Sequence, residues 1–458
     1  MGLPSNLVVQ QSNTPPVFRL RLIDLIVFLP LLGRSFFPHV RDTGSITFQS
    51  SFTDPQILGT YILWIYCFHR IVRRPTDLLN LSRLALWPFA LFSLIAITSA
   101  LFISRAPMYS LWRAIETTGV LLWGALILAQ AKRDGSPRRL FDSFYIMSLV
   151  MLMGVIVTVV RNPEHVWMME GKGVQRLDIN SGFLMGANSI GVTAALLSLA
   201  MIARLIISPK AQYIVLLSIS LGLCYAARSR TGFVILAFGL VLIIAYSIRL
   251  AGRRWAVIGT TFLGLLLSIG LIIVSPEFMD SITHTFTRGQ DQKNLASLDG
   301  RVSIWGTALK AFHGAPFVGS GYGTYPAWVS AIGHFHNVYI EIMVTMGIVG
   351  LIPILILTSV LATRIVGVWL RAPDGTTMHQ LASLDALLFG ITLILSDMTT
   401  AGAAYYSWQL IGMVVLSVGI QSIRAYTFND TTEDQYASMT FPRTPLQENP
   451  HPLRMTYK

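Results

Sequence analysis

Long runs of apolar residues constrain this chain more than any other feature of its sequence. Of its 458 residues, 53% are hydrophobic and 12% are charged, whereas a soluble domain carries about 25% charged residues. A helix that spans a bilayer needs about 20 mostly apolar residues. The fold class we predict is therefore all-α: a polytopic membrane helix bundle of about twelve transmembrane helices. The runs lie at approximately 20–37, 55–68, 84–103, 111–129, 143–160, 183–203, 212–227, 231–248, 255–274, 336–357, 382–400 and 407–423.

The Lys and Arg residues between these runs predict the orientation of the chain. A formal net charge of +12 in a soluble protein would suggest a nucleic-acid partner, but in a membrane protein basic residues collect in the cytoplasmic loops. Most of the Lys and Arg residues fall in alternate connections. We therefore predict that these connections and both termini are cytoplasmic, and we expect no nucleic-acid partner.

The polar segments divide the chain. Residues 1–17 and 428–458 are polar and contain proline, so we predict that each is a disordered cytoplasmic tail. The bundle occupies residues 18–427. Its longest outer connection is a large loop at 275–335, and long loops on rigid scaffolds often carry function. The two cysteines lie inside apolar runs, so neither a disulfide nor a thiolate metal site is expected.

The large loop contains one predicted amphipathic helix. Asp299 is a favourable N-cap, and Gly314 with Pro316 should end the helix. Arg301 projects toward the apolar face from the first turn, whereas Lys310 lies opposite. A helix N-terminus and a guanidinium both favour an anion, so we predict an anion site at Arg301, with an arginine snorkelling at the helix rim as the alternative. The apolar face comprises Val302, Trp305, Ala308, Leu309 and Phe312.

A second anion site is predicted in the tight turn between the seventh and eighth runs. Arg228 and Arg230 lie there, and Arg230 directly precedes the start of a helix whose free N–H groups attract anions. The two runs contain no Asp or Glu. A ligand phosphate is therefore a candidate partner for these arginines; a distant acid such as Asp397, or lipid headgroups, are the alternatives.

The tenth run begins with His336 and Asn337. An ionisable side chain at the mouth of a span is a functional-site hypothesis by default, and the alternative is that His336 anchors the helix end. Asn337 could orient a substrate or cap the helix. Upstream, Gly319 and Gly321 belong to an alternating-glycine stretch that resembles a phosphate cradle, but no clear strand precedes it. Zinc held by His336 with the loop histidines is a minor alternative, and we expect no metal and no cofactor.

At this point the motifs resemble a known family. His336-Asn337, followed after nine residues by Gly347 and then Gly350, resembles the signature of the O-antigen ligase family, whose wider superfamily includes the O-antigen and exopolysaccharide polymerases. Four other pieces agree and occur in family order over about residues 186–350. They do not distinguish a ligase from a polymerase. The pieces are Gly186-Ala187-Asn188 with Gly191, Ser229-Arg230-Thr231-Gly232, Gly300-Arg301 with Trp305, and Pro316 followed by Gly319-Ser320-Gly321-Tyr322-Gly323.

The resemblance implies an inverting, metal-independent glycosyltransferase of the bacterial inner membrane, with its active site on the periplasmic side. The donor would be a glycan on undecaprenyl diphosphate, and the acceptor a glycan or the lipid A core. Membrane lipids and other polysaccharide assembly proteins would be further partners. In this reading His336 is catalytic, Arg230, Arg301 and Arg228 bind the diphosphate, and supporting roles fall to Asn337, Asn188, Gly319 and Gly321.

The expected chemistry suits these residue types. A departing lipid diphosphate gains negative charge, which arginines and helix N-termini stabilise, and a histidine near its normal pKa can take a proton from a sugar hydroxyl. Within the superfamily we favour a polymerase over a ligase. The alternatives from other classes are a secondary transporter, which more often shows repeated halves, and a structural component whose arginines bind lipid headgroups. The sequence gives no role for Asp24, Glu116, Glu341 or Asp385.

Overall fold

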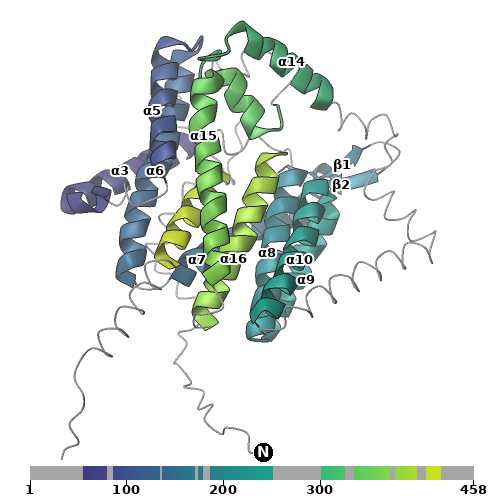
Figure 1. Ribbon diagram of the computed structural model, residues 1–458. Helices are drawn as coiled ribbons and strands as arrows, with labels where there is room; N and C mark the ends of the chain where they lie inside the picture. Colours follow the sequence, from purple (N-terminus) through teal and green to yellow (C-terminus); the bar gives the residue numbers. More distant parts are fainter. Residues whose placement is uncertain are drawn as a thin grey trace, which may run out of the picture.

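The computed structural model describes nine stretches of the chain and shows an all-α bundle with one small β-hairpin (Figure 1). The two polar tails, the runs at 20–37 and 255–274, Asp24 and the first half of the large loop lie outside these stretches. The described residues are 55–79, 86–134, 137–170, 174–178, 186–250, 301–324, 335–371, 377–399 and 409–423.

Ten of the twelve predicted apolar runs coincide with described helices. The helices that correspond to runs are α3 Pro55–Arg73, α5 Trp87–Phe102, α6 Pro107–Asp134, α7 Pro137–Arg161, α8 Ala187–Ile207, α9 Ala211–Ala227, α10 Arg230–Leu250, α15 Val338–Arg371, α16 Thr377–Asp397 and an unlabelled helix Gln409–Ile423. The loop helix is α14, Arg301–Gly314, and it ends at the glycine that the sequence indicated.

The described helices differ in length. Six of the described helices are long and apolar enough to cross a membrane: α6, α7, α8, α10, α15 and α16. Three apolar helices, α5, α9 and Gln409–Ile423, are shorter. Helix α3 lies crosswise to the upright helices in Figure 1. The chain is therefore a multi-pass membrane protein, and its described part does not reach twelve spans.

Short elements occupy the connection that follows α7. A 3-10 turn, η2 (Pro163–His165), leads into β1 (Trp167–Glu170), which pairs antiparallel with β2 (Val174–Leu177). Another 3-10 turn, η1 (Pro75–Leu79), follows α3. The β-hairpin matters for the site because the residue after β2 reaches the start of α8.

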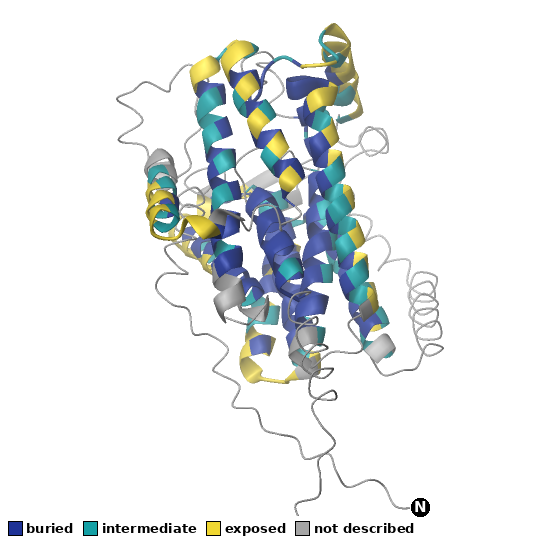
Figure 2. Ribbon diagram, turned by 60° about the vertical axis from the view of Figure 1, so that its left-hand side comes forward, coloured by how far each residue is buried: buried dark blue, intermediate teal, exposed yellow. Residues whose placement is uncertain are grey.

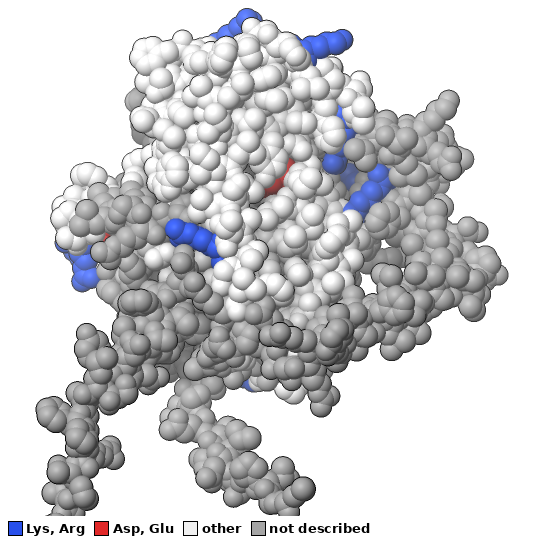
Figure 3. Space-filling model, viewed as in Figure 1, with Lys and Arg blue, Asp and Glu red and all other residues white. Residues whose placement is uncertain are grey.

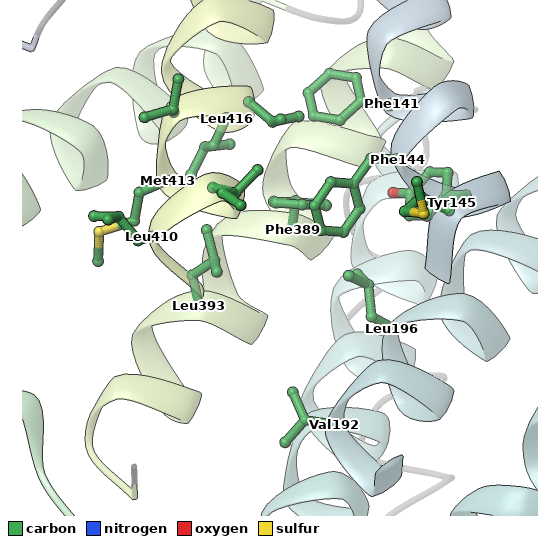
Figure 4. Close-up of a cluster of buried hydrophobic side chains, with 14 of the residues drawn as sticks. Phe141, Phe144, Tyr145, Val192, Leu196, Phe389, Leu393, Leu410, Met413 and Leu416 are labelled. Carbon is green, nitrogen blue, oxygen red and sulfur yellow. The ribbon is translucent and has the colours of Figure 1, made fainter. Parts of the chain in front are cut away.

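Interlocking aromatic and aliphatic side chains fill the centre of the bundle (Figure 4). Phe389 of α16 lies edge-on to Phe144 of α7, with ring centroids 4.6 Å apart, and also contacts Phe141 and Tyr145. Buried residues face this interior, whereas exposed ones lie on the outer faces (Figure 2). Many of the exposed residues are apolar, as expected for helix faces that contact lipid.

A buried ion-pair network joins three of these helices near the C-terminal end of α8. Both Nη atoms of Arg204 donate to the carboxylate of Asp385, at 3.0 and 3.1 Å, and Nη2 also donates to Asp142 of α7. Tyr145 donates to Asp385 at 3.1 Å. The bidentate geometry gives Asp385 a partner on α8 and fixes α7, α8 and α16 together. Because removing one member of such a network leaves an uncompensated charge, we assign Asp385 a structural role.

Candidate functional site

The stretch behind His336 does not run straight through the bundle. Inside α15, Gly347 has φ 64° and ψ −162°, so two helices meet there. In a straight helix Tyr339 and Thr358 would lie about 28 Å apart, yet the Tyr339 hydroxyl lies 3.4 Å from Oγ1 of Thr358. The two arms must therefore fold back on each other. The predicted single span at 336–357 is instead a helical hairpin, with a short arm Val338–Met346 and a long arm Ile348–Arg371.

The hairpin lowers the start of the short arm into the bundle. Thr358 lies about 16 Å down the long arm from the break, at ~1.5 Å per residue. Tyr339 reaches this level, and His336 lies just before it in the chain. The residues Phe335–Asn337 thus lie well below the apex at Gly347, rather than at the outer tip of a span.

A loop segment completes the hydrogen bonds that the break in α15 interrupts. The N–H groups of Ser320 and Gly321 donate to the carbonyl oxygens of Val344 and Thr345, at 3.0 and 2.8 Å. On the other side of the break, the N–H groups of Ile348 and Val349 donate to the carbonyl oxygens of Pro316 and Phe317. Residues 316–321 therefore act as a plug in the hairpin apex.

This plug explains the glycines of the loop. A Cβ on Gly319 would lie 2.4 Å from backbone atoms of Thr345 and Met346, and one on Gly321 would lie 2.5 Å from Cα of Ser104. Both glycines also have positive φ. Their position reflects close backbone packing, and the N–H of Gly321 is already used by α15, so the geometry does not form the phosphate cradle that the pattern suggested.

The next residues tie the plug to α5 and α6. The N–H of Tyr322 donates to Oγ of Ser99, and its hydroxyl lies 2.9 Å from Oγ1 of Thr117. Burial raises the pKa of the Tyr322 hydroxyl above its usual value, so this phenol stays protonated at neutral pH and is no base. Next to Thr117, Glu116 pairs with Arg113 at 3.0 Å. We therefore assign Glu116 a structural role in this cluster.

His336 has an unusual backbone conformation. Its φ is 54°, one of only two positive values at described residues other than glycine. Such a conformation costs about 1–3 kcal/mol and persists only where the surrounding structure imposes it. On its C-terminal side, Oδ1 of Asn337 accepts from the N–H groups of Tyr339 and Ile340, at 3.0 and 3.1 Å. Asn337 is therefore the N-cap of the short arm.

The preceding residue, Phe335, is held by two further elements. Its N–H donates to Oε2 of Glu341 at 3.3 Å, and its carbonyl accepts from Nε1 of Trp305 at 2.9 Å. Its buried ring packs with Ala308 of α14 and Val344. Glu341, for which the sequence gave no role, is thus part of the support beneath His336.

Helix α14 packs on the hairpin through a face that shares Trp305, Ala308 and Phe312 with the predicted one but also includes Ile304. Val302 and Leu309, expected on the apolar face, are 52% and 47% exposed, whereas Ile304 and Phe312 pack around Ala308. The prediction is wrong at Val302 and Leu309, because a helix on the rim of a membrane protein can expose apolar side chains. Arg301 is half-buried on the side of Trp305, and Lys310 is exposed, both as predicted.

The turn at Arg228 and Arg230 brings two helix N-termini together. Ser229 caps α10, since its Oγ accepts from the N–H of Gly232 at 3.2 Å, and the same hydroxyl lies 3.4 Å from Oδ1 of Asn188 in the first turn of α8. The backbone of Arg228 adopts the left-handed helical conformation, with φ 45°. Both arginines are half-buried beside this junction.

Glycines allow α8 and α10 to approach so closely at this junction. A Cβ on Gly232 would lie 2.8 Å from the backbone of Gly191, and one on Gly191 would overlap Ser229. The start of α8 is held from a third direction, because Oδ1 of Asp178, just after β2, accepts from the N–H of Ala187 at 3.3 Å. The motif residues around Asn188 and Arg230 thus form one compact unit.

Sequence reasoning treated Asp397 only as a distant partner for the arginines, and the structure places it at the end of α16, directly before the residue that contacts Asn337. The side chain of Asn337 donates to the carbonyl of Met398 at 3.2 Å, directly after the end of α16. Asp397 is fully buried, and within the described stretches neither of its carboxylate oxygens has a hydrogen-bond partner. An unpaired buried carboxylate is costly, which singles it out. Its apolar surroundings in the sequence were the available signal.

The site therefore gathers most of its predicted residues at one end of the bundle. The hairpin carries His336 and Asn337, and α14 carries Arg301. Asn337 contacts the residue that follows α16. Helix α16 in turn packs against α8 and α10, which carry Asn188 and Arg230. In Figure 1, α14 lies at the top of the molecule, above the upper ends of α8, α10 and α16. On the face drawn in Figure 3, uncharged residues predominate; basic groups lie at the top, on the left and on the right, and an acidic group lies near the centre.

Two comparisons with known proteins each match part of the chain. A family model described as O-Antigen ligase matches residues 213–355, from α9 to the long arm of α15. An exopolysaccharide production protein, ExoQ of Rhizobium meliloti (strain 1021), is 27% identical over 180 residues, which are 36% of this chain and 35% of that protein. The chain thus matches about a third of the length of this curated relative. The part of the chain that carries most of the motifs is therefore similar to the O-antigen ligase family, and the chain is also similar to a protein of exopolysaccharide production.

Proposed function

We propose that this protein transfers a glycan from undecaprenyl diphosphate to a sugar hydroxyl at the periplasmic face of the inner membrane, with inversion and without a metal. Arg301, Arg230 and Arg228 bind the diphosphate of the donor. His336 removes the proton from the acceptor hydroxyl. Both termini are cytoplasmic in this proposal, as the distribution of Lys and Arg suggests.

One observation carries the proposal. The indole of Trp305 bonds the carbonyl that precedes His336, and Trp305 lies one turn after Arg301 on the same side of α14. A cationic group at a helix N-terminus and an imidazole are thereby held in one packed unit. These are the two groups that metal-free displacement of a diphosphate requires: one to stabilise the leaving group and one to accept a proton.

The recessed position of His336 suits a lipid-linked donor. A diphosphate attached to a long polyprenyl chain must reach the site from the side of the bilayer. A reaction centre below the hairpin apex lies closer to the acyl chains than one on an exposed loop would, and a sheltered site strengthens the electrostatic contacts to the diphosphate.

Purified protein with a synthetic undecaprenyl-diphosphate glycan tests this proposal. Replacing His336 with Ala should lower turnover by about 10²–10⁴-fold while donor affinity stays close to that of the wild type. Replacing Arg301 or Arg230 with Ala should weaken donor binding, and Lys should restore it poorly because a forked contact is lost. Full transfer by the His336 variant would refute the proposal, as would normal donor use by both arginine variants.

We propose polymerase activity ahead of ligase activity, and the two differ in their products. The curated relative is described only as an exopolysaccharide production protein, whereas the matching family model is described as O-Antigen ligase. In a deletion strain, loss of a polymerase leaves single repeat units, and loss of a ligase leaves long chains on the lipid carrier. Finding long lipid-linked chains would reverse the preference.

A further inference from the structure

The backbone around His336 is held on both sides by side chains that the transfer chemistry itself does not use. Before it, the Phe335 carbonyl accepts from Trp305 at 2.9 Å and the Phe335 N–H donates to Glu341 at 3.3 Å. After it, Asn337 caps the short arm of α15 and bonds Met398. A peptide held at so many points can keep a conformation that a histidine rarely adopts.

The contact from Trp305 differs from the others because it comes from another element. Glu341 and Asn337 belong to the hairpin that carries His336, whereas Trp305 belongs to α14, a helix of the large loop. The packing of Ala308 and Phe312 against Phe335 strengthens this link. Helix α14 begins at Arg301, so whatever moves the first turn of α14 also moves the indole.

We propose that Trp305 is a positioning residue, which transmits the placement of α14 to the left-handed backbone at His336. The proposal rests on the function argued above and adds a consequence: a donor diphosphate that binds the N-terminal turn of α14 also fixes His336 in its reactive orientation. Without donor, the histidine would be less ordered. Proton removal would therefore be efficient only when donor is bound.

The test replaces Trp305 with Phe, which removes the indole N–H but keeps an aromatic ring. The control is Trp112→Phe, since Nε1 of Trp112 is buried without a hydrogen-bond partner in the described part of the chain. In full-length protein in detergent, hydrogen–deuterium exchange of the peptide covering residues 335–341 should be faster in the Trp305 variant and unchanged in the control.

Transfer kinetics and ligand protection complete the test. A small misplacement of a reacting group lowers turnover by roughly ten- to a hundredfold, so kcat of Trp305→Phe should fall by that factor while the donor KM changes little. Glycan-free undecaprenyl diphosphate should slow exchange at residues 335–341 in the wild type, and this protection should shrink in the variant. Glu341→Gln should preserve exchange and kcat better than Glu341→Ala, because the amide oxygen can still accept from Phe335.

The outcomes separate this inference from the proposed function. If Trp305→Phe matches the wild type in exchange and kcat while His336→Ala abolishes transfer, the positioning role is wrong and the function stands. Faster exchange with unchanged kcat would also overturn the positioning role. If His336→Ala keeps full transfer, the base is wrong, and with it the consequence for proton removal.

Discussion

At the scale of single residues, Asp397 is the side chain whose environment most requires an explanation. It is buried directly before Met398, whose carbonyl accepts from Asn337, and it has no hydrogen-bond partner within the described stretches. Replacing it with Asn should lower transfer at least about tenfold if the carboxylate contacts substrate. The Tm should hold or rise, because the amide keeps the size of the side chain and cannot ionise in this buried position.

The control for this prediction is Thr392→Ala, one turn earlier on α16, where the hydroxyl only bonds the carbonyl of Leu388. Transfer assays and thermal unfolding in detergent would be run side by side. A drop in Tm together with normal transfer per folded molecule would mean that Asp397 stabilises the bundle and has no part in the reaction.

Local signals in the sequence predicted the local structure of several residues of the candidate site, but not how they are supported. The cap at Asn337 and the inward side of Arg301 follow from neighbours within one helical turn, so helical spacing was sufficient to predict them. Trp305 bonds Phe335, which lies 30 positions away in the chain. Asp397 directly precedes Met398, which bonds Asn337 from 61 positions away. A single sequence carries no record of which distant residues meet, so these roles could only come from the folded chain.

At the scale of elements, the α15 hairpin determines where His336 lies. Gly347 adopts a conformation that is almost restricted to glycine, and a Cβ there would lie 2.3 Å from the backbone of Phe317. Gly347→Ala should therefore displace the plug, lower the Tm by at least about 5 °C and abolish transfer. Gly367→Ala in the long arm is the matched control, because a Cβ there meets nothing within 4 Å. Equal stability and activity of the two variants would contradict the hairpin.

Hydropathy could locate the helices but could not detect this hairpin. An apolar run looks the same whether it crosses the membrane once or folds back, since both arms consist mostly of apolar residues. The sequence signal was present in Gly347 and Gly350, but a motif read as a family signature does not reveal that one glycine breaks the helix. Gly350 completes the turn, because a Cβ on it would overlap the side chain of Met346.

At the scale of the whole molecule, the bundle has two chemically different ends. The end that carries α14 holds the site, where α8 and α10 begin and α9 and α16 finish. At the opposite end α6, α8, α10 and α15 finish and α7 and α9 begin, and the Lys and Arg residues between the apolar runs concentrate there. Because the two ends differ in this way, one labelling experiment can decide which end of the bundle faces the cytoplasm.

The experiment places single cysteines at Lys310 and Lys210, both exposed. Lys310 lies on α14 at the site end, and Lys210 directly precedes α9 at the opposite end. The native thiols of Cys67 and Cys224 are buried, so they should react slowly with a maleimide that cannot cross membranes. In intact cells Lys310→Cys should be labelled, and Lys210→Cys only after the membrane is disrupted, because basic ends stay cytoplasmic. The reverse pattern would put His336 and Arg301 on the cytoplasmic side, where a periplasmic donor cannot reach them, and the proposed reaction would then be excluded.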